Sequence, residues 1–192
     1  MDADRRASLL RDLAGVAPAD ARERGHLERM RELAEGRADP FDASRVAPGH
    51  FTASAFVVEA TATRVLLIHH AKLRRWLQPG GHVEVGDQDL LDAALREVRE
   101  ETGARALSPL LDAPFDVDVH TIPARGALGA HEHFDVRYLL EARSGEVSAG
   151  DGVLDCRWVP VDDLVASAED ESVARAVRKI AQLRASGRLG AR

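Results

Sequence analysis

Three glutamates in the middle of the chain have the spacing of a metal-binding group. Glu97, Glu100 and Glu101 are separated by three and four positions, so on an α-helix they would lie on one face. Like charges placed in this way destabilise a helix by roughly 0.2–0.5 kcal/mol per pair. A divalent cation would remove the repulsion, because Mg²⁺ and Ca²⁺ prefer carboxylate oxygens as ligands. The alternative is a solvated acidic face beside Arg96 and Arg99.

The helix that would hold these carboxylates is predicted at residues 89–102. Its apolar residues recur at helical spacing: Leu91, Ala94, Leu95, Val98 and Thr102. Asp89 can accept hydrogen bonds as the N-cap, with Asp92 three positions later as its capping-box partner. Gly103 can end the helix as a C-cap glycine. The sequence therefore places the three glutamates on a face that adjoins the apolar stripe of an amphipathic helix.

The segment before this helix is rich in glycine and joins it to a strand. Pro79-Gly80-Gly81-His82 would let the backbone approach a ligand or offer a carbonyl oxygen to a metal. The glycine loop and the acidic helix together resemble the Nudix box, over residues 81–104. Gly81 matches the opening glycine of that signature. The closing half is matched by Arg96, Glu97, Val98, Glu100, Glu101, Gly103 and Ala104.

One position departs from the family pattern. Five residues separate Gly81 from Asp87, where the pattern has Glu, and eight residues instead of seven separate Asp87 from Arg96. In the family that acidic residue mostly supports the loop and the arginine, a role that Asp can also fill. Contact between Asp87 and a metal stays an open question at this point.

The resemblance implies a fold, a reaction and a cofactor. It predicts a mixed α/β (α+β) sheet in a Nudix-type α/β/α sandwich, here with an N-terminal helical extension. The implied activity is Mg²⁺-dependent hydrolysis of a phosphoanhydride bond in a nucleoside diphosphate linked to another group, with Mn²⁺ as a substitute. Such chemistry depends mainly on positioning and charge stabilisation, which a metal supplies.

The same resemblance assigns roles to individual residues. Glu97, Glu100 and Glu101 are implied as metal ligands and catalytic groups, with the carbonyl of Gly81 as an additional ligand. Arg96 is implied to hold the glutamates and the loop in place.

Two other functions are compatible with such a domain. One is a non-catalytic domain that binds a nucleotide or ADP-ribose, but the intact glutamates argue against a decayed site. The other is isopentenyl-diphosphate isomerisation, which needs a cysteine near the site, whereas Cys156 lies far downstream of the box. We therefore expect a Nudix hydrolase, a pyrophosphohydrolase acting on phosphorus-containing anhydrides.

Further polar residues alternate along two predicted strands. His131, His133 and Asp135 would share one face of a strand, and a neighbouring strand carries Asp116, Asp118 and His120 in the same alternation. They form either the exposed face of a hairpin or a wall of the substrate cleft, and a zinc site is a third reading. We take His131, His133 and Asp135 as candidate substrate contacts.

Basic residues and carboxylates outside the box add further candidates. Arg75 belongs to a basic stretch before the glycine loop that could attract a polyphosphate. Trp76 is either a base-stacking residue or a buried part of the loop. A general base outside the box would be Glu132 or Asp135.

The composition limits the partners. A net charge of −6 argues against a nucleic-acid binder, because such proteins present basic surfaces to phosphates. A single cysteine fits a reducing cytoplasm, and the N-terminus has no apolar run typical of a signal peptide. No apolar stretch is long enough to span a membrane. We expect a cytoplasmic protein acting on a small-molecule nucleotide, with a homodimer as a possibility.

The remaining elements are predicted from periodicity. Residues 4–36 read as two helices, and residues 38–49 as a linker rich in proline and glycine. Strands are predicted at 51–59, 65–69, 115–120, 133–140 and 153–159, and a last helix at 169–185. The predicted organisation is a helical arm and linker at 1–48 and a Nudix domain at 49–188.

Overall fold

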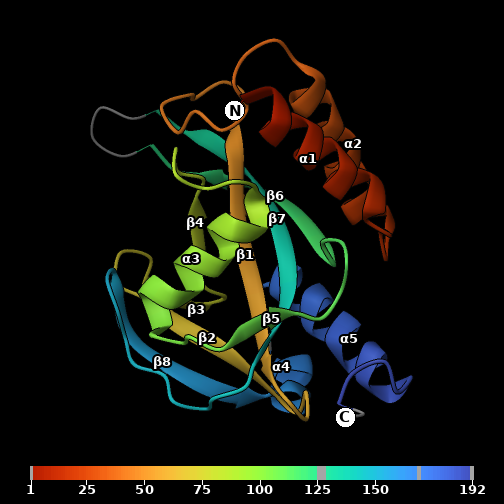
Figure 1. The fold of residues 1–192 in the computed structure, drawn as a ribbon, viewed down its shortest axis with the longest axis vertical. Helices are drawn as coiled ribbons and strands as arrows, with labels where there is room; N and C mark the ends of the chain where they lie inside the picture. Colours follow the sequence, from red (N-terminus) through yellow and green to blue (C-terminus); the bar gives the residue numbers. More distant parts are fainter. Residues whose placement is uncertain (1, 125–128, 168–169, 191–192) are drawn as a thin grey trace. The chain divides into compact units, whose positions relative to one another are not determined.

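A computed structural model of the chain describes residues 2–124, 129–167 and 170–190. Within it the chain forms two compact units, each assembled from separate segments. The first comprises Met1–Ser54, Gly80–Ala94 and Ala113–Tyr138. The second comprises Ala55–Pro79, Leu95–Asp112 and Leu139–Arg192. Helices and strands occur in each, so the predicted mixed α/β class is confirmed (Figure 1).

The first unit contains the N-terminal helices and a set of antiparallel strands. Its helices are α1 (Asp2–Gly15) and α2 (Ala21–Glu35). Its strands are the first half of β1 (Gly49–Glu59), β4 (Gly80–His82), β6 (Asp116–Ile122) and most of β7 (His131–Ala142). β4 pairs with β1, and β6 pairs with β7. The two helices predicted at 4–36 and the strands at 51–59, 115–120 and 133–140 are confirmed to within a few residues.

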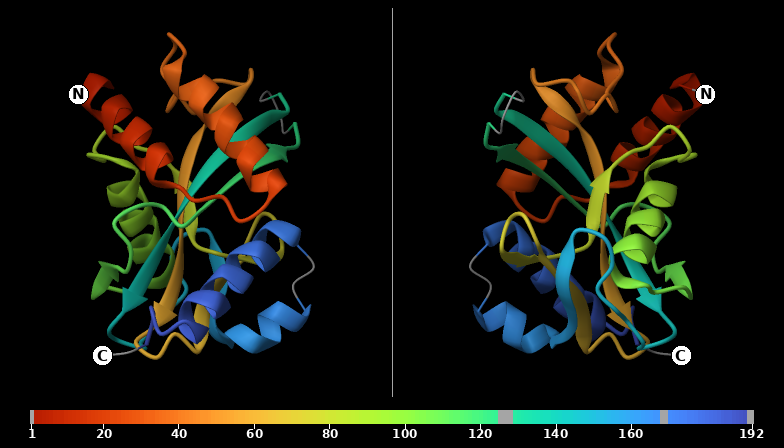
Figure 2. Two further views of the ribbon diagram at one scale, coloured as in Figure 1. Left: turned by 90° about the vertical axis from the view of Figure 1, so that its right-hand side faces the viewer. Right: turned by 90° about the vertical axis from the view of Figure 1, so that its left-hand side faces the viewer.

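The helical arm packs within this unit. α1 and α2 lie side by side in both views (Figures 1 and 2), and α2 also lies against β6. Their apolar stripes are buried, including Leu9, Leu13, Leu27 and Met30. The arm therefore covers apolar surface of its own unit, although the predicted boundary at residue 48 stays a prediction.

The second unit contains the other strands and the C-terminal helices. β2 (Arg64–His70) pairs with the second half of β1 and with β3 (Arg75–Leu77) and β8 (Val153–Pro160). β5 (Leu107–Pro109) pairs with the end of β7. α4 (Val161–Ser167) and α5 (Glu171–Ala185) pack against each other. The strands predicted at 65–69 and 153–159 and the last helix are confirmed.

The helix of the acidic residues, α3, spans Leu90–Thr102. Its N-cap is Asp89, whose carboxylate accepts the backbone N–H of Asp92 at 2.9 Å. Asp92 in turn accepts the N–H of Gln88 at 3.2 Å, one residue earlier than a capping box requires. Gly103 follows the helix with φ +68°, the left-handed conformation that favours glycine. The helix predicted at 89–102 is confirmed.

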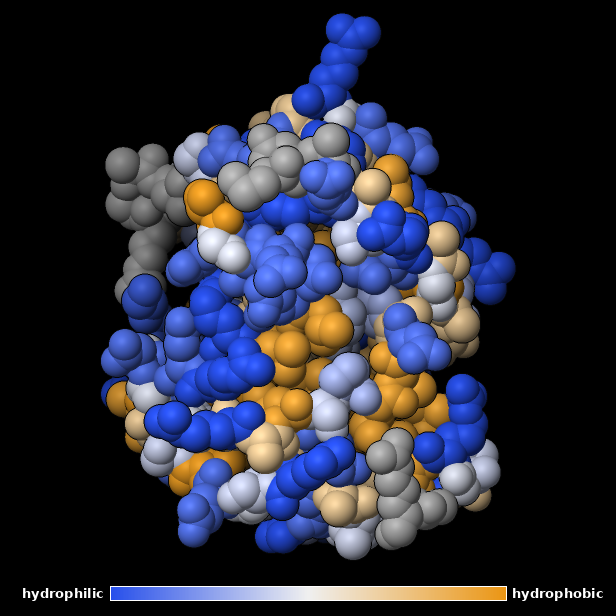
Figure 3. Space-filling model, viewed as in Figure 1, coloured by the Kyte–Doolittle hydropathy of each residue, from blue (hydrophilic) through white to orange (hydrophobic). Residues whose placement is uncertain are grey.

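Figure 3 shows that hydrophilic residues cover much of one face of the molecule, with hydrophobic residues gathered near its middle. Charged residues make up 30% of the sequence. Within the described residues, no helix is both long enough and apolar enough to cross a bilayer.

Candidate functional site

The acidic face of α3 is organised by one arginine. The Nη1 atom of Arg96 lies 2.9 Å from Glu97 Oε1 and 3.1 Å from Glu100 Oε2. Arg96 thereby contacts two of the three predicted ligands, from one turn of the same helix. One positive charge between two carboxylates leaves this part of the face negative.

The three glutamates differ in their exposure. The side chain of Glu100 is 54% exposed and that of Glu97 is 15% exposed. Glu101 is buried, on the side of the helix that Thr102 and Val98 also occupy. Burial of carboxylates is costly unless charged or polar groups compensate them. The exposure of the three carboxylates thus falls from Glu100 through Glu97 to Glu101.

The loop at residues 148–150 forms backbone hydrogen bonds to the C-terminal end of α3. The N–H of Ser148 donates to the carbonyl oxygen of Thr102 at 2.9 Å, and the N–H of Gly150 donates to that of Glu101 at 3.0 Å. A Cβ at Gly150 would lie 1.8 Å from the carbonyl oxygen of Glu100. Only glycine permits this approach, so the loop fixes the turn of helix that carries Glu100 and Glu101.

The glycine loop lies in the first unit and is shaped by close backbone packing. Gly81 in β4 pairs with Ala53 in β1. At Gly80 a Cβ would lie 2.3 Å from the Cβ of Ser54, so a larger residue would push the strands apart. Asp87 is buried, and its carboxylate accepts the N–H of Glu84 at 2.7 Å. Asp87 thus closes a turn of the loop, a supporting role for this departure from the family pattern.

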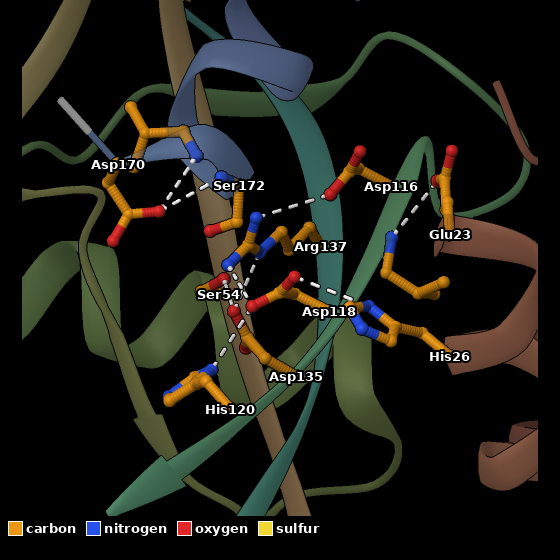
Figure 4. Close-up of polar contacts among 12 residues, drawn as sticks. Glu23, His26, Ser54, Asp116, Asp118, His120, Asp135, Arg137, Asp170 and Ser172 are labelled. Carbon is orange, nitrogen blue, oxygen red and sulfur yellow. Dashed lines mark hydrogen bonds and ion pairs between the residues drawn. The ribbon is translucent and has the colours of Figure 1, made fainter. Parts of the chain in front are cut away.

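The alternating polar residues of β6 and β7 lie on neighbouring strands, as predicted. The alternative that they form the exposed face of a hairpin is wrong, because most of them are buried. Asp118 pairs with Asp135 and His120 with His133 in the strand register. The aspartates are nevertheless buried, around the fully buried Arg137 (Figure 4). The arm was predicted, but its contact with β6 could not be read from local sequence.

Arg137 is the centre of this buried network. Its guanidinium lies 2.9 Å from Asp135, 3.2 Å from Asp116 and 3.5 Å from Asp118. Burial disfavours the charged form, yet the three carboxylates outweigh burial and raise the pKa of Arg137 above its ordinary value. Ser54 also donates to Asp135 at 2.8 Å. Because Asp135 has these internal partners, we do not include it among residues proposed to bind substrate.

His131 and His133, the other candidates on β7, belong to a group of histidines in the first unit. His120 on β6, His50 on β1 and His82 on β4 lie beside them, with ring centroids 4.9–5.6 Å apart for the neighbouring pairs. The sequence analysis missed His50 and His82. The sequence signal for them was weak: His50 directly precedes the strand predicted at 51–59, and His82 directly follows Gly81.

Arg75 lies in the second unit on β3, where it forms an ion pair with Asp170 at 2.9 Å. Its neighbour Trp76 stacks on His69 with ring centroids 5.1 Å apart, and the guanidinium of Arg157 lies 3.9 Å from the centre of the indole. The Trp76 ring thus has two stacking contacts within the unit. Glu132, the other candidate base, forms an ion pair with Arg29.

Comparison with known proteins identifies the family. A model of the NUDIX domain matches residues 49–180, and the chain belongs to the Nudix family. A Lactococcus lactis subsp. cremoris protein named "Probable DHNTP pyrophosphohydrolase" is 37% identical over 87 residues, which are 43% of this chain and 49% of that protein. The chain spans about half or less of the curated relatives that it matches.

Solved structures show the same fold. A NUDIX-family hydrolase from Clostridium perfringens matches with a TM-score of 0.50 and 26% identity, over 70% of this chain and 97% of that one. A C. elegans Ap4A hydrolase matches with a TM-score of 0.52 and 19% identity, over 71% and 98%. These are Nudix folds, so the predicted fold family is confirmed.

Proposed function

We propose that this chain is a Mg²⁺-dependent hydrolase that cleaves a phosphoanhydride bond in a nucleoside diphosphate linked to another group. The observation that carries the proposal is the acidic face of α3, where Glu97, Glu100 and Glu101 gather in one unit. Membership of the Nudix family supports it, since the family generally uses a divalent metal. A relative named as a pyrophosphohydrolase supports the choice of bond.

The chemistry of the donors fits a hard cation. All three groups are carboxylates, the ligands that Mg²⁺ and Mn²⁺ accept most readily. Bound there, the ion would stabilise charge on the phosphate oxygens and orient water. Glu97, Glu100 and Glu101 would hold it, while Arg96 fixes the positions of the Glu97 and Glu100 side chains. The proposed metal site consists of residues of α3 alone. Coordination by the carbonyl oxygen of Gly81 stays a prediction from the sequence.

Other residues of the second unit complete the proposal. The side chain of Arg75 is 56% exposed, so its guanidinium could exchange Asp170 for a substrate phosphate. We propose Arg75 as a substrate contact on this ground. We also propose the cytoplasm as the compartment, which the lone, unpaired Cys156 supports.

The test compares single substitutions that keep side-chain shape. Glu100→Gln and Glu101→Gln each remove one charged ligand, and we expect kcat to fall by about 100-fold or more. Binding of Mg²⁺ should weaken, while thermal melting without metal stays the same or rises slightly because repulsion is relieved. Glu171→Gln, at an exposed glutamate of α5, is the matched control.

The assay measures released phosphate or mononucleotide with Mg²⁺, Mn²⁺ or a chelator. The panel includes dihydroneopterin triphosphate, Ap4A and ADP-ribose, which the names of similar proteins suggest. Near-normal turnover in both glutamine variants, or full turnover in chelator, would refute the proposal. Tight binding of ADP-ribose without turnover would instead favour the non-catalytic alternative.

A further inference from the structure

Strand pairing in the first unit gathers five histidines from four strands. His82 lies opposite Thr52 in the pairing of β4 with β1, two residues from His50. His133 lies opposite His120 in the pairing of β7 with β6. The start of β1 approaches β7 closely, because Glu132 donates its N–H to the carbonyl oxygen of Pro48 at 3.2 Å.

A glycine makes that approach possible. A Cβ at Gly49 would lie 1.9 Å from the carbonyl oxygen of Glu132, so no larger residue fits there. The result is that His50, directly after Gly49, comes to within 5.2 Å of His131 and 4.9 Å of His133 between ring centroids. These contacts are long-range and fixed by backbone geometry.

Two nitrogen atoms at the centre of the group lack hydrogen-bond partners among the described residues. His50 is fully buried, and its Nε2 atom has no hydrogen-bond partner in the part of the chain that the structure describes. The Nε2 atom of His133 is likewise buried without a partner from residues 2–124, 129–167 and 170–190. Unpartnered buried polar atoms are rare and call for a physical cause, such as an ion bound in the functional protein.

The tautomer of His50 leaves a lone pair on the inner nitrogen. Its Nδ1 atom lies 3.2 Å from the carbonyl oxygen of Arg45, which can only accept, so Nδ1 carries the hydrogen. Nε2 is then unprotonated. A histidine that binds a metal commonly donates its other ring N–H to a backbone carbonyl in this way. His131 shows the same arrangement, with Nδ1 2.9 Å from the carbonyl oxygen of Gly129.

Burial disfavours the protonated form of two of these imidazoles, those of His50 and His133. Burial, followed by the neighbouring histidines, lowers the pKa of His133 to about 2, and burial also lowers the pKa of His50. A neutral imidazole has a lone pair on one ring nitrogen, which is the state in which histidine binds a metal.

We propose that His50, His82 and His133 bind a borderline divalent transition metal, for which Zn²⁺ is the representative ion. Their ligand nitrogens all lie within 4.8 Å of one another. A tetrahedral zinc ion with bonds of about 2.0–2.1 Å needs nitrogens roughly 3.3 Å apart, a difference that small side-chain rotations can close. His82 is exposed and can move to complete the set.

The ligand set distinguishes this metal from the one proposed on α3. Imidazole nitrogens suit Zn²⁺ and its neighbours in the transition series, whereas Mg²⁺ prefers oxygen. Three histidines leave one coordination position for water, for a ligand atom or for His131. Bound there, the ion would connect β1, β4 and β7, and so stabilise the glycine loop that begins in β4.

The test is a titration of the full chain with Zn²⁺ after treatment with a chelator. We expect one saturable site with a rise in melting temperature, and Co²⁺ in its place should give the visible spectrum of a nitrogen-coordinated ion. His133→Gln and His82→Gln should each weaken Zn²⁺ binding by at least about 100-fold. Because His82 is exposed, we expect His82→Gln to fold normally, and its melting temperature without metal checks this.

Two controls separate this site from the acidic helix. His120→Gln changes a histidine of the group outside the proposed triad, and should leave Zn²⁺ affinity within a few fold. Glu100→Gln should also leave it unchanged, and excess Mg²⁺ should not displace Zn²⁺. Absence of a saturable site, unchanged binding in both triad variants, or loss of binding in Glu100→Gln would overturn the proposal. None of these outcomes depends on whether the chain hydrolyses a nucleotide.

Discussion

Replacement of Arg137 by methionine tests whether the buried charge network stabilises the first unit. Methionine replaces the aliphatic part of the arginine side chain and has no charge, so it would leave Asp116, Asp118 and Asp135 buried without their shared cation. Arg137 is only 2% exposed, and the three carboxylates are each 5% exposed or less. Water therefore cannot take over the role of the guanidinium.

The size of the effect follows from this burial. Breaking a buried ion pair by removing one partner costs about 3–5 kcal/mol. Three carboxylates share this arginine, so we expect a loss of at least about 4 kcal/mol, a large part of the ~5–15 kcal/mol that stabilises most proteins. For a chain of this length, such a loss lowers the melting temperature by roughly 8–16 °C.

A matched control lies just beyond the same strand. Arg143 follows β7, and its side chain is 67% exposed, with Nε 3.9 Å from Glu141 Oε1. Arg143→Met removes an equal charge from solvent and should cost less than about 1 kcal/mol. The assay is denaturant unfolding at neutral pH, followed by circular dichroism. If Arg137→Met unfolds within about 1 kcal/mol of Arg143→Met, the carboxylates do not depend on Arg137 and our account of the network is wrong.

Three further substitutions have expected outcomes. Gly150→Ala places a Cβ 1.8 Å from the carbonyl oxygen of Glu100, so it should lower the melting temperature and weaken Mg²⁺ binding together, as calorimetry would show. Tyr138→Phe removes the 2.7 Å hydrogen bond to Asp12 and should cost about 1–2 kcal/mol in urea unfolding. Glu59 has a pKa lowered to about 2, chiefly by hydrogen bonds from Arg64. Because its ordinary value is 4.5, Glu59 stabilises the fold above pH 4.5 and loses this effect as the pH falls towards 2. The stability difference from Glu59→Gln should therefore shrink over that range, and a constant difference would contradict the assignment.

The elements that could be predicted from the sequence are those with local signals. Helix α3 has its apolar face, its N-cap at Asp89 and its C-terminal glycine at Gly103 within one short segment, so each can be read from neighbouring residues. The acidic face follows from that helix alone, because residues three and four apart must share a face. The short strands β3, β4 and β5 were missed, since three residues carry no readable periodicity.

What could not be predicted depends on contacts between distant residues. Asp118 was expected on a polar face, and its burial results from packing of the arm, some ninety residues earlier in the chain. His50 and His82 join His133 only through the registers of separate strand pairs and the approach at Gly49. Register over such separations is set by the whole sheet, not by neighbouring residues.

The packing of α2 against β6 has a consequence for association between molecules. β6 pairs with β7 along one side, so its other side presents backbone N–H groups at an edge. Two of them are occupied by side chains of α2. The N–H of Val117 donates to Glu23 Oε1 at 3.3 Å, and that of Val119 donates to His26 Nδ1 at 3.2 Å.

Side chains of a helix thus take the place of a neighbouring strand. An edge with free donors is a template on which another chain can add a strand and begin to aggregate. In helix α2, Glu23 and His26 lie about one turn apart and accept two of these N–H groups, so they block the edge without extending the sheet. Loss of the arm would reopen it, and β6 would then become the point at which one copy of the protein adheres to the next.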